Sequence, residues 1–322
     1  TAGRNYSTYA RGMNEIIRLK YQDIRAAIRP GRIVDEGCAD GALLAEVSQD
    51  FPDSDLYGID LSAEFGCRFQ ERQRAGEFGG AYVHFFHRNL FDRILDADSI
   101  DTTLCNSTLH EIWSYGEGDR SVRHYLAEKF RQLRPGGRLL IRDVVGPEQP
   151  DQEVLLECSA TDGTNPSPTE LAALGRDQAT LNQLSTHARF QLFSRDFRPG
   201  RSKFHFQEMP APDRPTYKLS LQNAAEFLSK KDYTDNWTSE MNEAFCFWSF
   251  SRWKAELAQA GFMVVENPNQ PAAHSRFYTN PWIVEHRYQN HVRLTDLTGA
   301  PLPWPPTNQV LIAEKPFAAN PK

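Results

Sequence analysis

The segment from Ile33 to Gly41, which reads IVDEGCADG, constrains the fold most strongly. Its apolar start predicts a buried strand, its glycines predict a turn, and the apolar residues that follow predict a helix. Gly37 and Gly41 let the backbone approach a ligand where a Cβ atom would collide, and the positive end of the helix points to the same place. About twenty residues later a second apolar run ends on Asp60, from which a carboxylate can bind a ribose. The pairing predicts a nucleoside-binding edge in a doubly wound α/β sheet.

The apolar pattern alternates between strands and helices along much of the chain. Strands are expected at 32–36, 55–60, 82–87, 100–106 and 138–145, and helices near 10–29, 42–51, 63–78 and 119–133. Such alternation indicates parallel strands with helices on both faces. Residues 146–220 are rich in Pro, Gly, Arg and Gln and break the pattern, with one helix expected around 168–194. The alternation of helices and strands resumes with an aromatic helix at 241–260 and strands at 262–265 and 309–313. We therefore expect a cofactor-binding part of the core at 1–145, an inserted, mostly helical cap at 146–240, and completion of the core by 241–322.

Composition excludes several classes of protein. The 322 residues, 40% hydrophobic and 24% charged, are typical of a globular chain, and the net charge of −6 gives no basic footprint for nucleic acid, although Arg195, Arg198 and Arg201 could contact phosphate. The five cysteines lack CxxC spacing, which favours free thiols in a reducing compartment. No apolar run approaches the roughly twenty residues that span a bilayer, and the polar amino end lacks a signal-peptide core. We expect a cytoplasmic protein without membrane contact. The start at Thr1 is typical of a trimmed chain or of a domain excised from a longer protein.

Four segments in order resemble the class I S-adenosylmethionine-dependent methyltransferases. They are VDEGCADG at 34–41, GID at 58–60, LCNSTLHE at 104–111 and LRPGGRLLI at 133–141. Their order and spacing match the family, and the likeness covers about residues 10–145 and 240–315. The resemblance implies a Rossmann-like sheet of seven strands whose last strand is antiparallel, with S-adenosylmethionine as the cofactor.

The resemblance also implies a cofactor site, carried over position by position. Asp60 would bind the ribose hydroxyls beside Leu61, and Asn89 and Leu90 would lie beside the adenine. Tyr9, like Tyr6, precedes the first helix in a segment that folds over the cofactor in similar enzymes. The methionine and ribose portions would be surrounded by Asp35, Gly37, Cys38, Ala39 and Gly41, with Asn106 and Ser107 along the methionine side. Ala39 stands where the family usually has glycine, and Asn89 where it often has an acid.

The chemistry of methyl transfer points to His110. A sulfonium expels a neutral thioether, so the protein must chiefly align the reactants, and a base helps where the acceptor carries a proton. His110 directly follows the fourth strand, and Glu111 beside it could orient the imidazole. Alternatively, His110 caps the following segment or only shapes the acceptor pocket. His274, His286 and His291 lie on a late connection, but their spacing matches no metal-ligand motif, so no metal is expected.

Three functions remain open at this point. A nicotinamide dehydrogenase needs G-x-G-x-x-G, and the third glycine is missing here. A cap in this position usually encloses the acceptor, which favours a methyltransferase acting on a small molecule or a carrier-tethered group. The alternatives are an RNA or protein methyltransferase and a non-catalytic domain that binds S-adenosylmethionine.

Overall fold

The computed structural model describes residues 16–198, 204–211, 214–267, 269 and 273–317. These residues form two compact units. The core unit comprises the described parts of 6–143, 251–276 and 309–322, and the insert unit comprises those of 144–250 and 277–308. Within the described ranges, every helix falls short of the length and apolarity that crossing a membrane requires.

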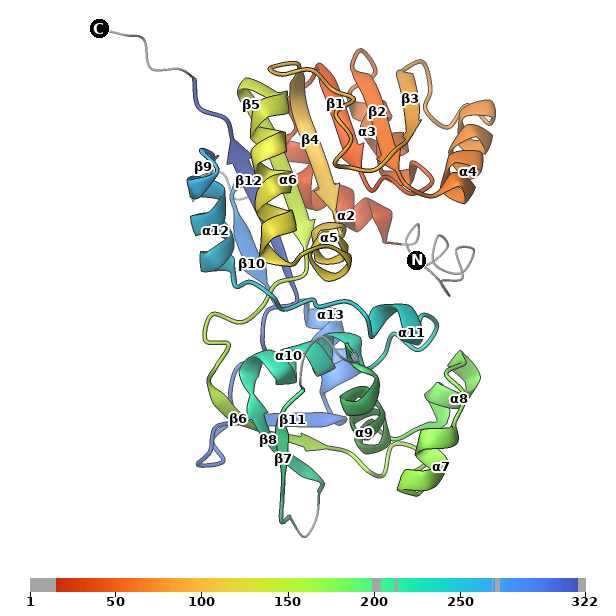
Figure 1. Cartoon of the computed structure of the whole chain (residues 1–322), viewed down its shortest axis with the longest axis vertical. Coiled ribbons are helices and arrows are strands. Elements are labelled where there is room, and N and C mark those ends of the chain that lie inside the picture. The colour runs from red at the N-terminus through yellow and green to blue at the C-terminus, as the bar shows by residue number, and fades with distance from the viewer. Residues whose placement is uncertain (1–15, 199–203, 212–213, 268, 270–272, 318–322) are drawn as a thin grey trace, which may run out of the picture. The chain divides into compact units, whose positions relative to one another are not determined.

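The core unit is built on one twisted sheet (Figure 1). Its parallel strands are β1 (Arg32–Glu36), β2 (Asp55–Asp60), β3 (Tyr82–His87), β4 (Ile100–Asn106) and β5 (Leu133–Asp143). The spatial order is β3-β2-β1-β4-β5-β12, and β12 (Asn308–Glu314) runs antiparallel to β5. The expected doubly wound fold and its antiparallel last strand are thus confirmed. The sheet has eight strands because two short strands, β9 (Met263–Val264) and β10 (Arg276–Tyr278), both lie along the other edge of β12.

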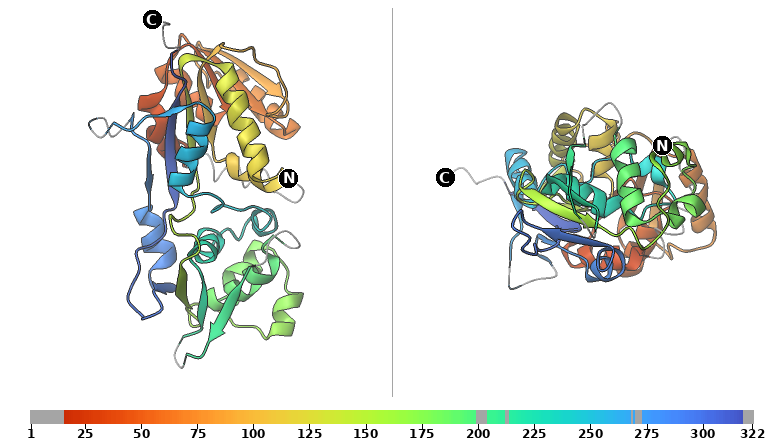
Figure 2. Two further views of the ribbon diagram at one scale, coloured as in Figure 1. Left: turned by 60° about the vertical axis from the view of Figure 1, so that its left-hand side comes forward. Right: turned by 90° about the horizontal axis from the view of Figure 1, so that it is seen from below.

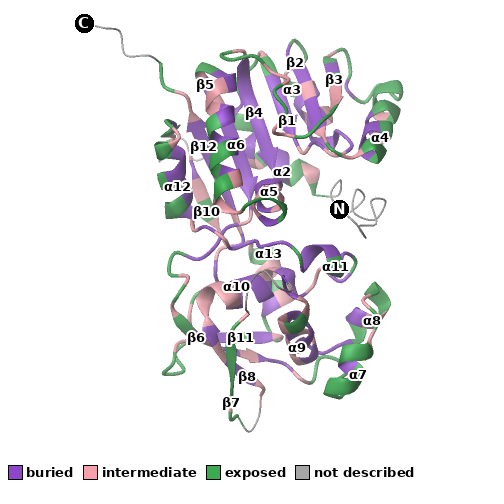
Figure 3. Cartoon of the chain, viewed as in Figure 1, coloured by how far each residue is buried: buried purple, intermediate pink, exposed green. Residues whose placement is uncertain are grey.

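Helices cover both faces of this sheet (Figure 2). One face carries α2 (Ile17–Ile24), the short 3-10 turn η1 (Arg25–Ala27), α3 (Ala42–Asp50) and α4 (Ala63–Arg74). The opposite face carries α5 (Leu109–Tyr115), α6 (Asp119–Gln132) and α12 (Phe250–Gln259). Contacts from the strands identify the two faces. Gly58 of β2 lies against Leu44 of α3, whereas Glu36 of β1 faces the opposite side, where it forms a buried ion pair with Lys129 of α6. Figure 3 shows the central strands almost wholly buried, and every residue of β4 is buried, as is typical of parallel strands covered on both faces.

Most predicted boundaries in the core unit agree with the structure to within a few residues, and the aromatic helix is the main exception. It begins at Phe250 rather than near residue 241. The carboxylate of Glu226 accepts hydrogen bonds from the backbone N of Phe245 and of Cys246, at 3.1 and 2.7 Å. These bonds take backbone donors that a helix would use, so the residues before Phe250 are held in an irregular conformation.

The insert unit contains a second sheet that the sequence pattern did not predict. Its antiparallel order is β11-β6-β8-β7, with β6 (Glu153–Cys158), β7 (Phe206–Met209), β8 (Thr216–Ser220) and β11 (Val292–Thr295). The helices are α7 (Pro168–Ala173), α8 (Gln178–Gln183), α9 (Thr186–Asp196), α10 (Leu221–Lys230), α11 (Trp237–Glu240), α13 (Pro281–Ile283) and the π-helical η3 (Val284–Tyr288). The single helix expected at 168–194 is three helices, because Asp177 and Ser185 each begin a new one with a side-chain cap.

Residues 277–308 belong to the insert unit. The sequence analysis expects them to complete the core and expects the cap to span only 146–240. Strand β11 of these residues instead pairs with β6, with Leu294 opposite Leu156. Its side chains join an aromatic core in which the rings of Phe190 and Tyr217 stack with centroids 3.8 Å apart. The insert unit therefore consists of two stretches of chain that share one hydrophobic core.

Candidate active site

The turn after β1 has the geometry that its glycines predict. The backbone N of Gly37 and of Cys38 donate to the carbonyl oxygen of Ile59 at 2.9 and 3.2 Å, which fixes the turn against the end of β2. Gly37 and Gly41 have φ of 72° and 82°, values that favour glycine. A Cβ atom at Gly37 would also collide with the side chain of Thr108. The turn therefore approaches the segment after β4 closely.

Ala39 adopts a left-handed conformation within this turn. Its φ of 47° is one that costs a residue with a Cβ atom about 1–2 kcal/mol. The backbone N of Ala39 donates to Asp60 Oδ2 at 3.0 Å. The departure from the family's usual glycine is thus accommodated with strain, and Asp60 holds the strained peptide in place.

The Asp60 carboxylate, at the end of β2, binds both the turn after β1 and the segment after β2. Besides Ala39, its carboxylate accepts a hydrogen bond from the backbone N of Ser62, with Oδ1 2.8 Å away. Burial raises the pKa of Asp60, and the hydrogen bonds from Ser62 and Ala39 oppose that rise. Ser62 in turn caps α4. The carboxylate is therefore fixed at the carboxyl edge of the sheet, the position at which it was expected to bind a ribose.

Asp35 and Cys38 are buried beside this turn. Burial, the largest cause, together with the charges of Asp60 and Glu36, raises the pKa of Asp35 to about 8. A Cβ atom at Gly58 would lie 2.7 Å from Cys38 Sγ, so the thiol fills the space above Gly58. Burial also raises the pKa of the Cys38 thiol well above its ordinary value, which keeps it protonated. Cys38 thus contributes packing and backbone rather than a reactive sulfur.

The residues expected near the adenine follow β2 and β3. Leu61 is 67% exposed, and its carbonyl oxygen lies 2.9 Å from His87 Nε2. Asn89 is exposed and forms a turn, since its Oδ1 accepts from the backbone N of Phe91 at 3.0 Å; Leu90 beside it is half-buried. These residues lie at the same edge of the sheet as Asp60. Tyr9, and Tyr6 with it, lie outside the described residues.

On the methionine side, the structure adds a residue that the sequence analysis missed. Asn106 ends β4 and is buried, and Ser107 follows with a φ of 55° and donates its backbone N to the carbonyl oxygen of Arg142 at 2.8 Å. Lys20 Nζ from α2 lies 3.5 Å from Ser107 Oγ. Lys20 occupies the apolar face of its helix together with Tyr21 and Ile24, which is the signal that could have identified it.

His110 is oriented by Asp143, the last residue of β5. Their atoms Nδ1 and Oδ1 are 2.7 Å apart, and the two side chains are 9% and 1% exposed. Asp143 Oδ2 also accepts from the backbone N of Leu109 and of His110, at 2.8 and 3.3 Å. An ionised carboxylate can only accept, so Nδ1 carries a hydrogen toward it. The sequence analysis proposes Glu111, the neighbour of His110 on α5, for this orienting role; the structure adds Asp143 as the partner of Nδ1.

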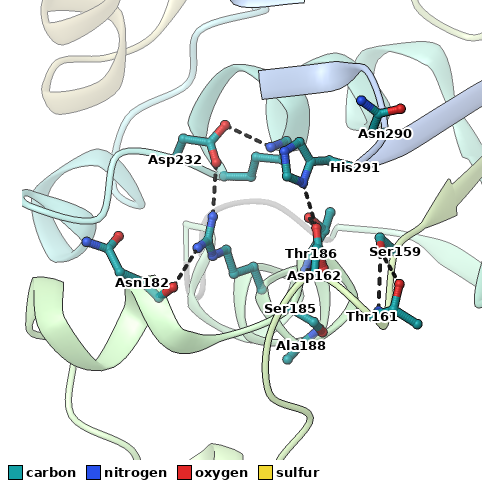
Figure 4. Close-up of polar contacts among 12 residues, drawn as sticks. Ser159, Thr161, Asp162, Asn182, Ser185, Thr186, Ala188, Asp232, Asn290 and His291 are labelled. Carbon is teal, nitrogen blue, oxygen red and sulfur yellow. Dashed lines mark hydrogen bonds and ion pairs between the residues drawn. The ribbon is translucent and has the colours of Figure 1, made fainter. Parts of the chain in front are cut away.

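Two late histidines have partners of their own. His286 Nδ1 lies 2.9 Å from the carbonyl oxygen of Trp282, one helical turn earlier. His291 Nδ1 lies 2.7 Å from Asp162 Oδ2, and Asp162 also accepts from the hydroxyl and the backbone N of Thr186 (Figure 4). Each histidine therefore contributes to the packing of the insert unit separately.

Part of the core unit matches a known protein family. A family model described as a methyltransferase domain matches residues 34–139. No curated protein sequence matches the chain.

Several solved structures have a similar arrangement of chain. A Nostoc punctiforme protein assigned as an O-methyltransferase is 15% identical with a TM-score of 0.48, over 96% of this chain and 60% of that one, so the chain spans less than two thirds of its length. YcgJ from Bacillus subtilis is 15% identical with a TM-score of 0.46, over 94% and 99% of the two chains. The geranyl diphosphate C-methyltransferase of Streptomyces coelicolor, in complex with Mg²⁺, geranyl diphosphate and S-adenosylhomocysteine, is 10% identical with a TM-score of 0.44, over 92% and 79%.

The matched residues 34–139 extend from β1 through the glycine turn and Asp60 to β5, and so include every parallel strand of the sheet. That segment is therefore a methyltransferase domain of class I, whose cofactor is S-adenosylmethionine.

Proposed function

We propose that this enzyme methylates an oxygen or nitrogen nucleophile on a small molecule or a carrier-tethered group, with His110 as the general base. The observation that carries the proposal is the 2.7 Å contact between His110 Nδ1 and Asp143 Oδ1 at the carboxyl edge of the sheet. A histidine held by a buried carboxylate through one ring nitrogen presents the other, Nε2, as the proton acceptor. Such a pair is useful when the acceptor must lose a proton.

Bound S-adenosylmethionine would supply the methyl group: as the acceptor's lone pair bonded to the methyl carbon, the carbon–sulfur bond would break and leave its electron pair on sulfur in a neutral thioether. His110 Nε2 would take the acceptor's proton. Asp143 stabilises the imidazolium that results, and general base catalysis of this kind contributes about 10²- to 10⁴-fold.

The cofactor would lie across the turns that follow β1, β2 and β4. Asp60 would accept hydrogen bonds from the ribose, and the backbone between Gly37 and Gly41 would contact the ribose and methionine portions. Asn89 and Leu90 would adjoin the adenine. This arrangement is supported by the shared sheet edge, since all of these segments follow the carboxyl ends of parallel strands.

The acceptor class is supported by the insert. The chain enters the insert unit at Val144, directly after Asp143, the last residue of β5. The alternative of an RNA acceptor relied on the arginines at 195–201. Of these, Arg198 is only 7% exposed, which weakens that alternative. We therefore favour a small or carrier-tethered acceptor over a polymer.

A labelling experiment tests the proposal. The enzyme is incubated with methyl-labelled S-adenosylmethionine and separate panels of phenols, amines, carboxylic acids, total RNA and unfolded protein. We expect transfer to one of the small-molecule panels, and loss of that transfer in His110→Ala with S-adenosylhomocysteine binding retained. Transfer to RNA or protein alone would overturn the acceptor class, and binding without transfer to any panel would favour the non-catalytic alternative.

A further inference from the structure

The insert unit carries a pocket whose residues have no part in the proposed function. Its volume is about 620 Å³, within the usual range of small-molecule sites. Two segments of chain line it. One runs through α13 and η3 and supplies Val284, Glu285 and Gln289, and the other follows β11 and supplies Pro303 and Trp304. Both segments belong to the insert unit, so the pocket is a feature of that unit alone.

The fold of the insert unit fixes the lining of this pocket. The ring of Trp304 packs against that of the buried Tyr288, with centroids 5.2 Å apart. The hydroxyl of Thr279 donates to the carbonyl oxygen of Pro305 at 3.2 Å and so ties the two segments together. The helix η3 is π-helical, a rare conformation that is frequent at functional sites. A ligand would therefore enter a preformed site, and little binding energy would be lost in ordering it.

The formal charge in the lining is the carboxylate of Glu285. This residue is exposed, and no group that the structure describes forms an ion pair or hydrogen bond with its carboxylate. The two basic residues that follow it on η3 contact other groups. The ring of His286 stacks on Trp282 with centroids 4.6 Å apart. The guanidinium of Arg287 lies over the rings of Tyr233 and Trp282, at 5.5 and 5.6 Å. The negative charge of Glu285 is thus available to a group that enters the pocket.

The chemistry of the lining favours an organic cation. The carboxylate of Glu285 attracts positive charge, and the indole of Trp304 is the aromatic group that attracts a cation most strongly. Gln289 adds an amide oxygen that can accept a hydrogen bond from an ammonium. An anion would be repelled by Glu285, and a neutral apolar ligand would remove water from the carboxylate without compensation.

We propose that this pocket binds the ammonium group of a small organic amine. The inference goes beyond the proposed function and does not depend on it, because it concerns binding by the insert unit in the absence of S-adenosylmethionine.

The test compares three probes of similar size and different charge. Benzylamine is protonated at pH 7, benzyl alcohol is neutral and benzoate is an anion. The indole N–H signal of Trp304 in ¹⁵N-labelled protein, assigned with Trp304→Phe, reports on the pocket directly. Benzylamine should shift this signal with a dissociation constant at least about fivefold below that of benzyl alcohol, and benzoate should leave the signal unmoved.

A charge-removing variant identifies the group responsible. Glu285→Gln keeps the size of the side chain, so benzylamine should bind about three- to tenfold more weakly while benzyl alcohol stays within about twofold. Asp151→Asn is the matched control, since Asp151 is an exposed acid of the same unit outside the pocket. It changes the net charge equally and should leave both affinities unchanged.

The opposite results are equally definite. Equal affinity of the wild-type protein for benzylamine and benzyl alcohol, or unchanged benzylamine affinity in Glu285→Gln, would overturn the recognition of an ammonium group. A Trp304 signal that no probe shifts would overturn the pocket as a binding site. Neither cofactor nor turnover enters these measurements, so their failure would leave the proposed function untouched.

Discussion

Asp143 contacts His110 twice: its carboxylate lies 2.7 Å from the imidazole Nδ1 and accepts a hydrogen bond from the backbone N of His110 at 3.3 Å. It also accepts one from the backbone N of Leu109 at 2.8 Å. The same carboxyl group therefore starts helix α5 and orients the ring that the helix carries. Negative charge at a helix amino end is stabilising, so the orientation of the base and the position of the helix depend on one residue.

Replacing either member of this pair should slow methyl transfer with little effect on cofactor affinity. His110→Ala and Asp143→Asn should each lower kcat by about 10²- to 10⁴-fold, and the double variant should be scarcely slower than the worse single one, because the residues act as a unit. The measurement is turnover with the identified acceptor at saturating S-adenosylmethionine.

A control separates this effect from misfolding. Glu111→Gln changes the neighbouring residue on the same helix, and activity retained in this variant would assign the orienting role to Asp143, the partner of Nδ1. Normal turnover in Asp143→Asn would show that alignment of the reactants, without a general base, accounts for the rate of methyl transfer.

The sequence predicted the local parts of this site and missed the distant ones. The glycine turn and the position of Asp60 follow from apolar patterning within a few residues of each. The partnership of His110 with Asp143 joins residues 33 positions apart, and nothing in either local pattern specifies it. Strand β11 pairs with β6 across more than a hundred residues, so a polar connection could not be recognised as part of a sheet.

Asp60 should be needed for cofactor affinity. Asp60→Ala removes a charged acceptor from the ribose site, and each charge-assisted hydrogen bond contributes about 1.5–3 kcal/mol. It also removes the acceptor for the backbone N of Ala39 and of Ser62, so a modest loss of stability is expected as well. Calorimetry with S-adenosylhomocysteine, beside a thermal scan of the free protein, measures both effects. An unchanged dissociation constant would show that Asp60 serves only the turn.

Ala39 should be replaceable by glycine with a gain in stability. At φ 47°, the substitution Ala39→Gly relieves strain of about 1 kcal/mol, partly offset by the greater freedom of glycine in the unfolded chain. The opposite change at a crowded position, Gly58→Ala, should destabilise the fold, because the new Cβ atom would lie 2.7 Å from Cys38 Sγ. Chemical denaturation of the two variants gives the comparison. A loss of stability in Ala39→Gly would mean that the methyl group of Ala39 makes packing contacts worth more than the strain.

Asp35 should make the stability of the free protein depend on pH with a definite sign. Its pKa is about 8 in the folded protein and 3.8 ordinarily, so between these values the folded state binds a proton that the unfolded state lacks. Stability from this group therefore falls as pH rises through that window and is lowest at and above pH 8. Asp35→Asn cannot ionise, so its melting temperature should exceed that of the wild-type protein by a margin that widens from pH 5 to pH 8. The exposed Asp53→Asn should follow the wild-type protein throughout. A margin that stayed constant with pH would show that Asp35 is ionised in the fold, and its burial would then have to be compensated by a neighbouring cation such as Lys20.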